Sequence, residues 1–197
     1  MDMNILSIPN LGVSNERHYV LSTVMKKGVP KGLWLEFGVA TGKTINLIST
    51  YTDLVYGFDS FEGLPEKWRD GFEKGAFNRN GEFPQVNDNV ILIKGLFTDT
   101  LAPFLKEQNK KISFMHIDCD LYSSTKTILE EIFPYLDKEC ILVFDELVNY
   151  PGYEDGELKA FSEFISKHNL MYEWIGMNGT IGLKGGRHEC VGVKLFL

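Results

Sequence analysis

The sequence lacks any long apolar run and any excess of positive charge. None of its 197 residues belong to a stretch approaching the roughly 20 apolar residues that a membrane-spanning helix needs. The start of the chain, residues 1–12, lacks the basic flank and continuous apolar segment of a signal peptide. With 27 acidic and 20 basic side chains, the net charge of −7 opposes attraction to nucleic acid or anionic lipid. We therefore expect a cytoplasmic protein with neither a membrane nor a nucleic-acid partner.

Cysteine is also scarce. Cys119, Cys140 and Cys190 are far apart and lie in or beside strand-like segments, which favours free thiols over a disulfide framework or a zinc site. The chain has no internal repeat, no low-complexity tract and no change of composition that would mark a linker. We expect residues 1–197 to form a single domain, with residues 1–30 as a helical lead-in.

Short apolar runs alternate with longer amphipathic ones along most of the chain, which is the rhythm of βαβ units around a parallel sheet. The expected strands are 33–37, 54–58, 90–93, 112–117 and 141–144. The expected helices are 15–27, 43–51, 100–108, 125–136 and 157–168. Residues 172–176 and 190–196 are expected to form a terminal hairpin across a glycine-rich connection. The pattern predicts an α/β fold with a Rossmann-like, mostly parallel sheet.

One connection is much longer than the usual 2–6 residues of such folds. Residues 60–89 separate two strands and carry several aromatic side chains, among them Trp68, Phe72 and Phe77. We interpret this segment as a lid-like insertion that could wall a substrate site. The alternative is that its aromatic residues only pack the insertion against the domain.

The turn after the first expected strand contains two glycines, Gly38 and Gly42, and leads into a helix. It matches neither the dinucleotide fingerprint nor the P-loop, whose spacing and glycine positions differ. Glu36 precedes the turn and would repel a pyrophosphate, whereas it could pair with a cationic ligand. Asp59 ends the next strand about 20 residues later, where an acid reaches ribose hydroxyls in related folds. These features favour S-adenosylmethionine, which is cationic and has no phosphates, although a glycine turn alone is common to α/β proteins.

Four acids follow the later strands: Asp118, Asp120, Asp145 and Glu146. The carboxyl ends of parallel strands meet at one edge, so these side chains should converge there. Their repulsion requires raised pKa values or a bound cation. Oxygen ligands without a histidine cluster favour Mg²⁺, which could orient an acceptor hydroxyl and lower its pKa. In the alternative, Asp118 only touches the donor and the other acids cap helices or face solvent.

Neighbouring polar residues have simpler interpretations. His116 lies within an apolar strand, where a hydrogen-bonded core histidine is favoured over a catalytic one. Ser123, Ser124 and Thr125 are expected to cap the following helix.

Several blocks of the sequence resemble the macrocin O-methyltransferase family, which includes sugar O-methyltransferases of antibiotic biosynthesis. The blocks span about residues 28–164, and they are Leu35–Val39, Val55–Pro65, Lys94–Leu101, His116–Thr127 and Val143–Gly152. Blocks that occur together in the right order are far more specific than any one motif. The resemblance implies a class I methyltransferase fold with seven strands, the last of them antiparallel, and helices on both faces.

The resemblance also implies site residues. Asp120 would be the general base, and Mg²⁺ would bind Asp118, Asp145 and Glu146; metal-dependent members carry Asp-Asp where this chain has Asp145-Glu146. Together with the strand-end argument, it gives these expected donor-binding residues: Glu36, Phe37, Gly38, Thr41, Gly42, Thr44, Asp59, Ser60, Phe61, Gly95 and Asp118.

The leading functional hypothesis is a magnesium-assisted, S-adenosylmethionine-dependent O-methyltransferase. Its partner would be a small-molecule acceptor, a sugar or a natural product that can be glycosylated, and Trp68, Arg69 and Tyr150 could stack on a sugar ring. A metal-independent methyltransferase and a catalytically silent S-adenosylmethionine-binding protein remain alternatives. A nicotinamide oxidoreductase is disfavoured by the missing middle glycine. The sequence leaves the acceptor and the oligomeric state, including a homo-oligomer, open.

Overall fold

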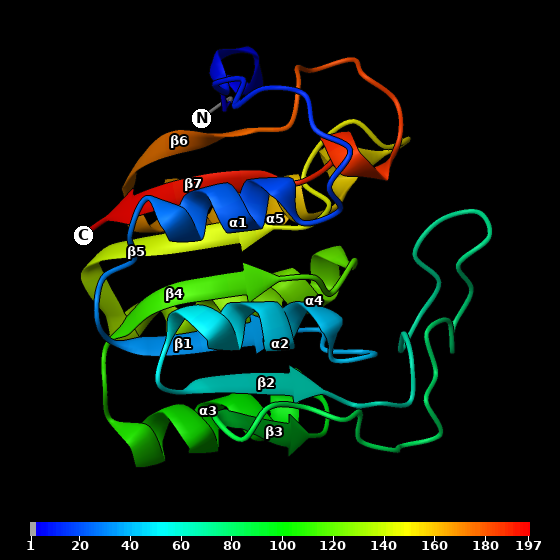
Figure 1. Cartoon of the computed structure of the whole chain (residues 1–197), viewed down its shortest axis with the longest axis vertical. Helices are drawn as coiled ribbons and strands as arrows, with labels where there is room; N and C mark the ends of the chain where they lie inside the picture. Colours follow the sequence, from blue (N-terminus) through cyan, green and yellow to red (C-terminus); the bar gives the residue numbers. More distant parts are fainter. Residues whose placement is uncertain (1–2) are drawn as a thin grey trace.

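A seven-stranded sheet organises the computed structural model, which describes residues 3–197. The strands are β1 (Leu33–Phe37), β2 (Val55–Asp59), β3 (Val90–Lys94), β4 (Ile112–Ile117), β5 (Leu136–Phe144), β6 (Met171–Met177) and β7 (Val191–Phe196). Their spatial order is β3-β2-β1-β4-β5-β7-β6, and β7 alone runs antiparallel to its neighbours (Figure 1). The Rossmann-like methyltransferase topology and the terminal hairpin are confirmed.

Helices cover both faces of this sheet (Figure 1). The α-helices are α1 (Tyr19–Lys26), α2 (Lys43–Ile48), α3 (Phe97–Gln108), α4 (Tyr122–Ile132) and α5 (Glu157–His168). Single 3₁₀ turns occur at Ile5–Ser7, Ser49–Tyr51, Phe133–Tyr135, Tyr153–Asp155 and Gly186–His188. Among residues 3–197, no helix combines the length and apolar content that crossing a membrane requires.

The core forms two layers because successive strand residues point to opposite faces. In β1, Leu35 and Phe37 pack with the residues of α3, α4 and α5. Trp34 lies on the other face, in a cluster with residues of α1 and α2. Phe114 of β4 joins Trp34 there, with ring centroids 4.9 Å apart. Strands buried on both faces in this way have continuous apolar runs, which is why they could be predicted from the sequence.

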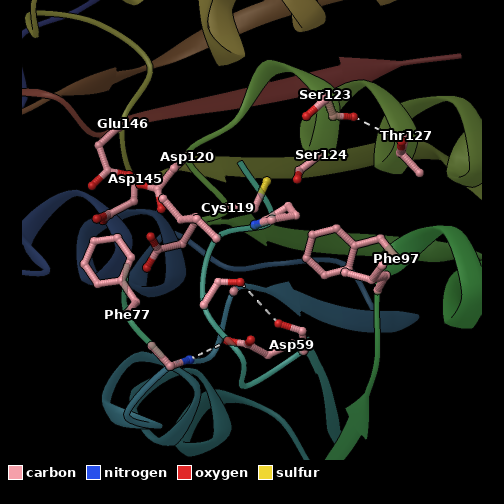
Figure 2. A pocket seen from close by; sticks show the side chains of 18 of the residues that line it. Asp59, Phe77, Phe97, Cys119, Asp120, Ser123, Ser124, Thr127, Asp145 and Glu146 are labelled. Atoms are coloured by element: carbon pink, nitrogen blue, oxygen red, sulfur yellow. Dashed lines mark hydrogen bonds between the residues drawn. The ribbon is translucent and has the colours of Figure 1, made fainter. Parts of the chain in front are cut away.

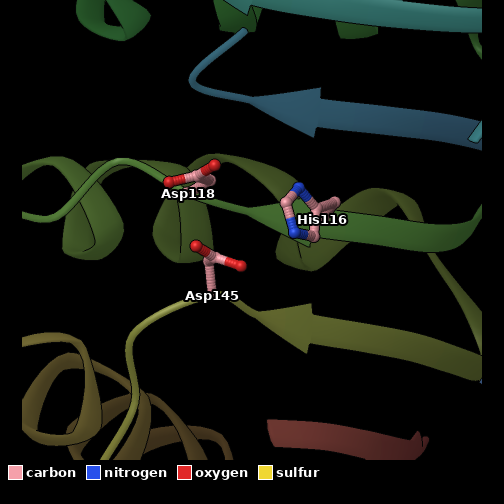
Figure 3. A group of neighbouring side chains, drawn as sticks. All are labelled: His116, Asp118 and Asp145. Carbon is pink, nitrogen blue, oxygen red and sulfur yellow. The ribbon is translucent and has the colours of Figure 1, made fainter. Parts of the chain in front are cut away.

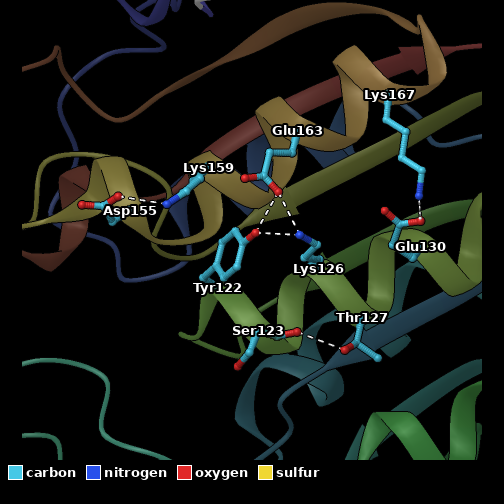
Figure 4. Close-up of polar contacts among 9 residues, drawn as sticks. All are labelled: Tyr122, Ser123, Lys126, Thr127, Glu130, Asp155, Lys159, Glu163 and Lys167. Atoms are coloured by element: carbon cyan, nitrogen blue, oxygen red, sulfur yellow. Dashed lines mark hydrogen bonds and ion pairs between the residues drawn. The ribbon is translucent and has the colours of Figure 1, made fainter.

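The helices α4 and α5 pack side by side and are joined by charged side chains on their exposed faces (Figure 4). Lys126 Nζ lies 3.1 Å from Glu163 Oε2, and Tyr122 donates a 2.7 Å hydrogen bond to the same oxygen. Lys167 pairs with Glu130 farther along. Solvent screens such exposed pairs, so apolar burial between the helices is the main stabilising term.

The structure corrects several expected boundaries. β5 begins at Leu136 rather than residue 141, because its polar first half pairs with the end of β7 beyond the core. α1 begins at Tyr19 rather than residue 15, and α3 begins at Phe97 rather than residue 100, after a residue without a side-chain cap. The three cysteines are free thiols, as expected.

The expected serine and threonine caps of α4 are wrong. The helix begins at Tyr122, and its N-cap, Leu121, makes no side-chain cap. Ser123 instead donates a 2.5 Å hydrogen bond to Glu66 in the long insertion. Thr125 is buried and donates to Glu157 of α5, with 3.2 Å between the oxygens. These hydroxyls therefore join elements together.

The insertion of residues 60–89 contains neither a helix nor a strand and extends beyond the carboxyl ends of the strands (Figure 1). Turns and an isolated bridge between Arg69 and Phe72 shape it. Its role as a lid, and the assignment of the chain to one domain, stay predictions.

Candidate active site

A cavity of about 460 Å³ opens at the carboxyl edge of the sheet. Its walls come from the segments that follow β1 to β5 and from the insertion (Figure 2). Nine residues expected in the site line it: Gly38, Thr41, Asp59, Ser60, Gly95, Asp118, Asp120, Asp145 and Glu146. This is the place where open parallel sheets bind ligands, because the loops diverge there.

Five expected donor-binding residues do not line the cavity. Phe37 is wholly buried in the core, and Phe61 is buried under the insertion beside Phe83. Gly42 packs against Pro84 at the base of the insertion, and Thr44 lies inside α2. Glu36 is fully buried. These five residues support the structure around the cavity. Because they do not line it, its shape does not favour direct contact between them and a donor.

Glu36 faces its cross-strand neighbour His116 instead of the cavity. The two residues are directly opposite in the β1–β4 register, and Glu36 Oε1 lies 3.0 Å from His116 Nδ1. Burial by itself would lower the pKa of His116, but the hydrogen bond and charge of Glu36 raise it to about 9. The histidine is thus a hydrogen-bonded core residue, as the sequence favoured. The positively charged partner of Glu36 is therefore His116, within the protein, and not a bound ligand.

Gly38 is required by the backbone that lies against it. Its φ is +89°, and a Cβ at this position would lie 1.7 Å from the carbonyl oxygen of Asp118. The amide of Asp118 also donates to the carbonyl of Phe37, at 2.9 Å. The turn after β1 and the end of β4 are therefore in direct contact, and only glycine permits that approach.

Asp59 organises the same turn through its carboxylate. Oδ2 accepts hydrogen bonds from the amides of Val39 and Ala40, at 2.9 and 2.8 Å. Oδ1 accepts one from the amide of Phe61, at 2.7 Å. Hydrogen bonds to an ionised acceptor are stronger than neutral ones, so Asp59 fixes both the glycine turn and the first residues of the insertion. It still lines the cavity, and Oδ1, which accepts one of the three bonds, has spare acceptor capacity.

The four acids after β4 and β5 converge as expected. Ligand atoms of Asp118, Asp120 and Glu146 all lie within 4.8 Å of one another. A second group within the same limit joins Asp118 to Asp145 and His116 (Figure 3). The expected metal set of Asp118, Asp145 and Glu146 is thus spread over two overlapping groups that share Asp118.

This edge carries more negative charge than its surroundings compensate. Burial and the neighbouring Asp145 raise the pKa of Asp118 well above its ordinary value. Burial also raises the pKa of Glu146, with Asp118 as the main charged contributor. The pKa of Asp120 rises to about 7, because burial outweighs the opposing effect of Arg69. Without a cation, the cluster therefore retains protons at a pH where ordinary carboxyls are ionised.

Asp120 has an unusual backbone conformation, with a φ of +64°. Aspartate tolerates this left-handed region better than most residues. The side chain is 6% exposed and lines the cavity, and this burial holds it in one orientation. We name the part of the cavity wall formed by Asp118, Asp120, Asp145 and Glu146 the acid edge. A carboxyl group whose pKa lies near neutrality is well suited to accept a proton from a substrate.

Arg69 brings a positive charge from the insertion toward this edge. Its guanidinium lies 3.8 Å from the ring centroid of Trp68 and 4.9 Å from that of Tyr150. A guanidinium nitrogen is 3.7 Å from Glu189 Oε2, on the segment before β7. Arg69 therefore connects the insertion with two other loops.

Sequence reasoning missed several residues of the cavity. They include Arg17, Lys43, Phe97, Ser123, Ser124 and Thr127, whereas Phe77 belongs to the insertion that was expected to wall a substrate site. Phe97 and the three hydroxyl residues follow β3 and β4, so their position just after a strand was the usable signal. Arg17 precedes α1 and carried no local signal, since its placement depends on how that helix packs across the sheet.

The acid edge fits a hard divalent cation. Its candidate ligands that line the cavity are carboxylate oxygens, with His116 as a buried member of one group, and Glu146 Oε2 is buried without a hydrogen-bond partner among residues 3–197. An unpartnered buried carboxylate oxygen is costly unless a proton or cation compensates it. Oxygen ligands of this kind suit Mg²⁺.

Comparison with known families gives a direct match. A family model described as a methyltransferase domain matches residues 35–147, which is more than half of the chain. The match covers β1 to β5 and includes Asp118, Asp120, Asp145 and Glu146.

A curated relative is the 8-demethyl-8-(2,3-dimethoxy-alpha-L-rhamnosyl)-tetracenomycin-C 4'-O-methyltransferase of Streptomyces olivaceus. It is 28% identical over 155 residues, which are 65% of this chain and 57% of the relative. The aligned part of the chain thus spans less than two thirds of that enzyme.

Solved structures share the fold. The calicheamicin methyltransferase CalS11 has a TM-score of 0.61 and 22% identity, over 91% of this chain and 76% of the other. The O-methyltransferase NovP has a TM-score of 0.58 and 21% identity, over 89% and 76%. An O-methyltransferase from Bacillus cereus, solved with SAH, has a TM-score of 0.56 and 13% identity, over 96% and 84%.

Proposed function

The chain belongs to the methyltransferase-domain family whose model matches residues 35–147, and we propose that it transfers a methyl group from S-adenosylmethionine to a hydroxyl of a sugar or small natural product. The observation that carries this proposal is the pairing of a cavity at the carboxyl edge of the sheet with a buried carboxyl, Asp120, whose pKa is raised to about 7. The curated relative, named as an O-methyltransferase of a rhamnosylated compound, supports the acceptor class.

In this proposal the donor lies over the turn after β1. Gly38 and Thr41 border its methionine part, and Asp59 and Ser60 border its ribose, with Gly95 near the base. Because Asp59 is already fixed by three backbone amides, a ribose hydroxyl would meet an oriented acceptor. Preorganisation of this kind lowers the entropic cost of binding.

The proposed reaction is an in-line displacement at the methyl carbon. A lone pair of the acceptor oxygen forms the new C–O bond, and the C–S bond breaks with its electron pair remaining on sulfur. Asp120 accepts the hydroxyl proton. The cavity brings donor and acceptor together, and such positioning can supply several kcal/mol of the required rate enhancement.

Asp118, Asp145 and Glu146 would hold Mg²⁺, which supplies Lewis-acid stabilisation of the developing alkoxide. Asp145 comes from the end of β5 and Asp118 from the end of β4, so adjacent strands position them. The buried, unpartnered oxygen of Glu146 supports its place in this set.

The test combines binding and turnover. Isothermal calorimetry should show S-adenosylhomocysteine binding, and mass spectrometry should show a 14 Da gain on a member of an acceptor panel. The panel contains a nucleoside-diphosphate rhamnose, a rhamnosylated polyketide and a catechol. Loss of turnover in EDTA with recovery in Mg²⁺ is expected.

The alternatives give different results in the same experiment. Full activity in EDTA would favour a metal-independent methyltransferase. Donor binding without transfer to any acceptor would favour a silent S-adenosylmethionine-binding protein.

A further inference from the structure

Phe77 is an aromatic side chain of the insertion that lines the cavity and remains 50% exposed. Figure 2 shows it at the side of the cavity where Asp145 and Glu146 lie, while Phe97 lies at the opposite side. A half-exposed aromatic ring in the wall of a cavity offers an apolar surface to a bound molecule. The ring of Phe77 therefore faces the acid edge and not the side formed by the segment after β3.

The backbone of Phe77 is in a conformation that bulky residues rarely adopt. Its φ is +65°, in the left-handed region, which is strained for a residue of this kind. The neighbouring turn is closed by a hydrogen bond from the amide of Asn78 to the carbonyl of Gly75, at 3.2 Å. Strain of this kind persists where the surrounding structure holds the residue in place.

A continuous series of ring contacts supports Phe77 on the side away from the cavity. Phe77 stacks on Phe72, with centroids 5.4 Å apart and planes 27° apart. Phe72 contacts Trp68 at 5.1 Å, and Trp68 contacts Tyr150 at 5.8 Å. We name Tyr150, Trp68, Phe72 and Phe77 the aromatic ladder. It runs from the loop after β5 to the cavity, and Phe77 is its only member that lines the cavity.

Arg69 packs on the other end of the aromatic ladder, where Trp68 and Tyr150 lie. The guanidinium covers Trp68 and Tyr150, at 3.8 and 4.9 Å from their centroids. A guanidinium over an aromatic face is attracted to the ring electrons, so these contacts are stabilising. These two rings, which the sequence suggested as a sugar platform, thus have a structural partner already. Their contacts with Arg69 hold the insertion over the acid edge.

From this arrangement we propose that Phe77 is the platform for the acceptor, and that the acceptor is a ring-shaped molecule that places an apolar face on Phe77 and a hydroxyl toward Asp120. The proposal rests on the proposed function and adds the residue that selects the acceptor. A pyranose has such a face of C–H groups, whereas an open-chain polyol does not. The donor would occupy the other side of the cavity, near Asp59 and Phe97.

Phe83 offers a matched control. It belongs to the same insertion, is 56% exposed and contacts Phe61 at 5.2 Å, but it does not line the cavity. Replacing Phe77 or Phe83 with alanine removes one exposed ring from the same segment. Only Phe77→Ala should weaken the binding of an acceptor.

The experiment measures ring binding separately from catalysis. Saturation-transfer NMR with methyl α-L-rhamnopyranoside, and with glycerol as the open-chain control, is recorded on protein saturated with S-adenosylhomocysteine. We expect the rhamnoside to bind and glycerol to give no signal. Phe77→Ala should weaken rhamnoside binding about tenfold, Phe77→Tyr should retain it, and Phe83→Ala should leave it unchanged.

Three results would overturn the inference: no rhamnoside binding by the parent protein, equal binding by Phe77→Ala, or an equal loss in Phe83→Ala. Calorimetry with S-adenosylhomocysteine on every variant verifies that the donor site is intact. Failure of donor binding or of methyl transfer counts against the proposed function, whereas ring binding that is insensitive to Phe77 counts only against this inference.

Discussion

The ends of β2 and of β5 both carry a carboxylate at the cavity, but the two carboxylates have opposite surroundings. Asp59, after β2, accepts hydrogen bonds from the amides of Val39, Ala40 and Phe61. For Asp145, after β5, the neighbours within 4.8 Å are another acid, Asp118, and His116 (Figure 3). Backbone amides satisfy the first carboxylate, whereas the second lies between an acid and a histidine.

This difference distinguishes an acid that stabilises the fold from acids that need a cation or a proton. A carboxylate that backbone amides satisfy stabilises the fold whether or not a ligand is bound. Carboxylates that crowd each other without donors destabilise the ligand-free protein, and a cation or a proton relieves them.

The largest effect is expected from Asp120→Asn. Asparagine adopts positive φ readily, so the backbone should be retained, but the amide cannot accept the hydroxyl proton. We expect turnover to fall about 10²- to 10⁴-fold, with the affinity for S-adenosylhomocysteine unchanged. Initial rates and calorimetry measure the two quantities. Asp155→Asn, at an exposed acid paired with Lys159, is the control and should retain activity; full turnover in Asp120→Asn would exclude it as the base.

Metal removal should have the next largest effect. Dialysis against EDTA should reduce turnover by about 100-fold, since a metal supplies several kcal/mol of charge stabilisation. Adding Mg²⁺ should restore the rate, whereas Asp145→Ala should prevent the recovery. Turnover in EDTA equal to that in Mg²⁺ would mean that the acid edge works without a metal.

Replacing the two acids should affect stability in different ways. Asp59→Ala removes the acceptor of three backbone amides and should lower the free energy of unfolding by about 3 kcal/mol. Asp145→Ala relieves repulsion with Asp118 and should leave the free energy of unfolding of the metal-free protein equal or higher. Urea unfolding in EDTA measures both. An equal loss in the two variants would break the comparison.

The smallest effect is a pH dependence of stability. The pKa values of Asp118, Asp120, Glu146 and Glu157 are all raised, mainly by burial, so the folded state binds more protons than the unfolded state. Stability should therefore be greatest near the ordinary carboxyl values and fall as the pH rises through about 7. We expect the metal-free Tm to drop by a few degrees between pH 5.5 and pH 8. Mg²⁺ should raise the Tm at pH 8, and Glu146→Gln should reduce that gain.

The sheet could be predicted from the sequence because its signal is local. The boundaries of β1, β4 and α5 coincide with the predicted ones, since buried runs and amphipathic patterns end abruptly there. The first half of β5 was missed because its residues are polar and pair beyond the core. The antiparallel direction of the last strand came from the resemblance, and the spatial order of the strands was not predicted.

The convergence of the four acids could also be predicted, because parallel strands bring their carboxyl ends to one edge. The role of Glu36 could not, since its pairing with His116 depends on the register of β1 against β4. The orientation of the insertion likewise depends on the contact between Arg69 and Tyr150, a ring far away in the sequence. Local sequence carries no record of such contacts.

The contact between Gly38 and Asp118 has a consequence for how the enzyme could diversify. Because the carbonyl of Asp118 occupies the space that a side chain at position 38 would need, the turn after β1 and the end of β4 must move as one rigid piece. Under the proposed function, the separation between the donor side and the base side of the cavity is thereby built into the main chain. Changes of acceptor would then be left to the insertion, which can exchange side chains without altering that spacing.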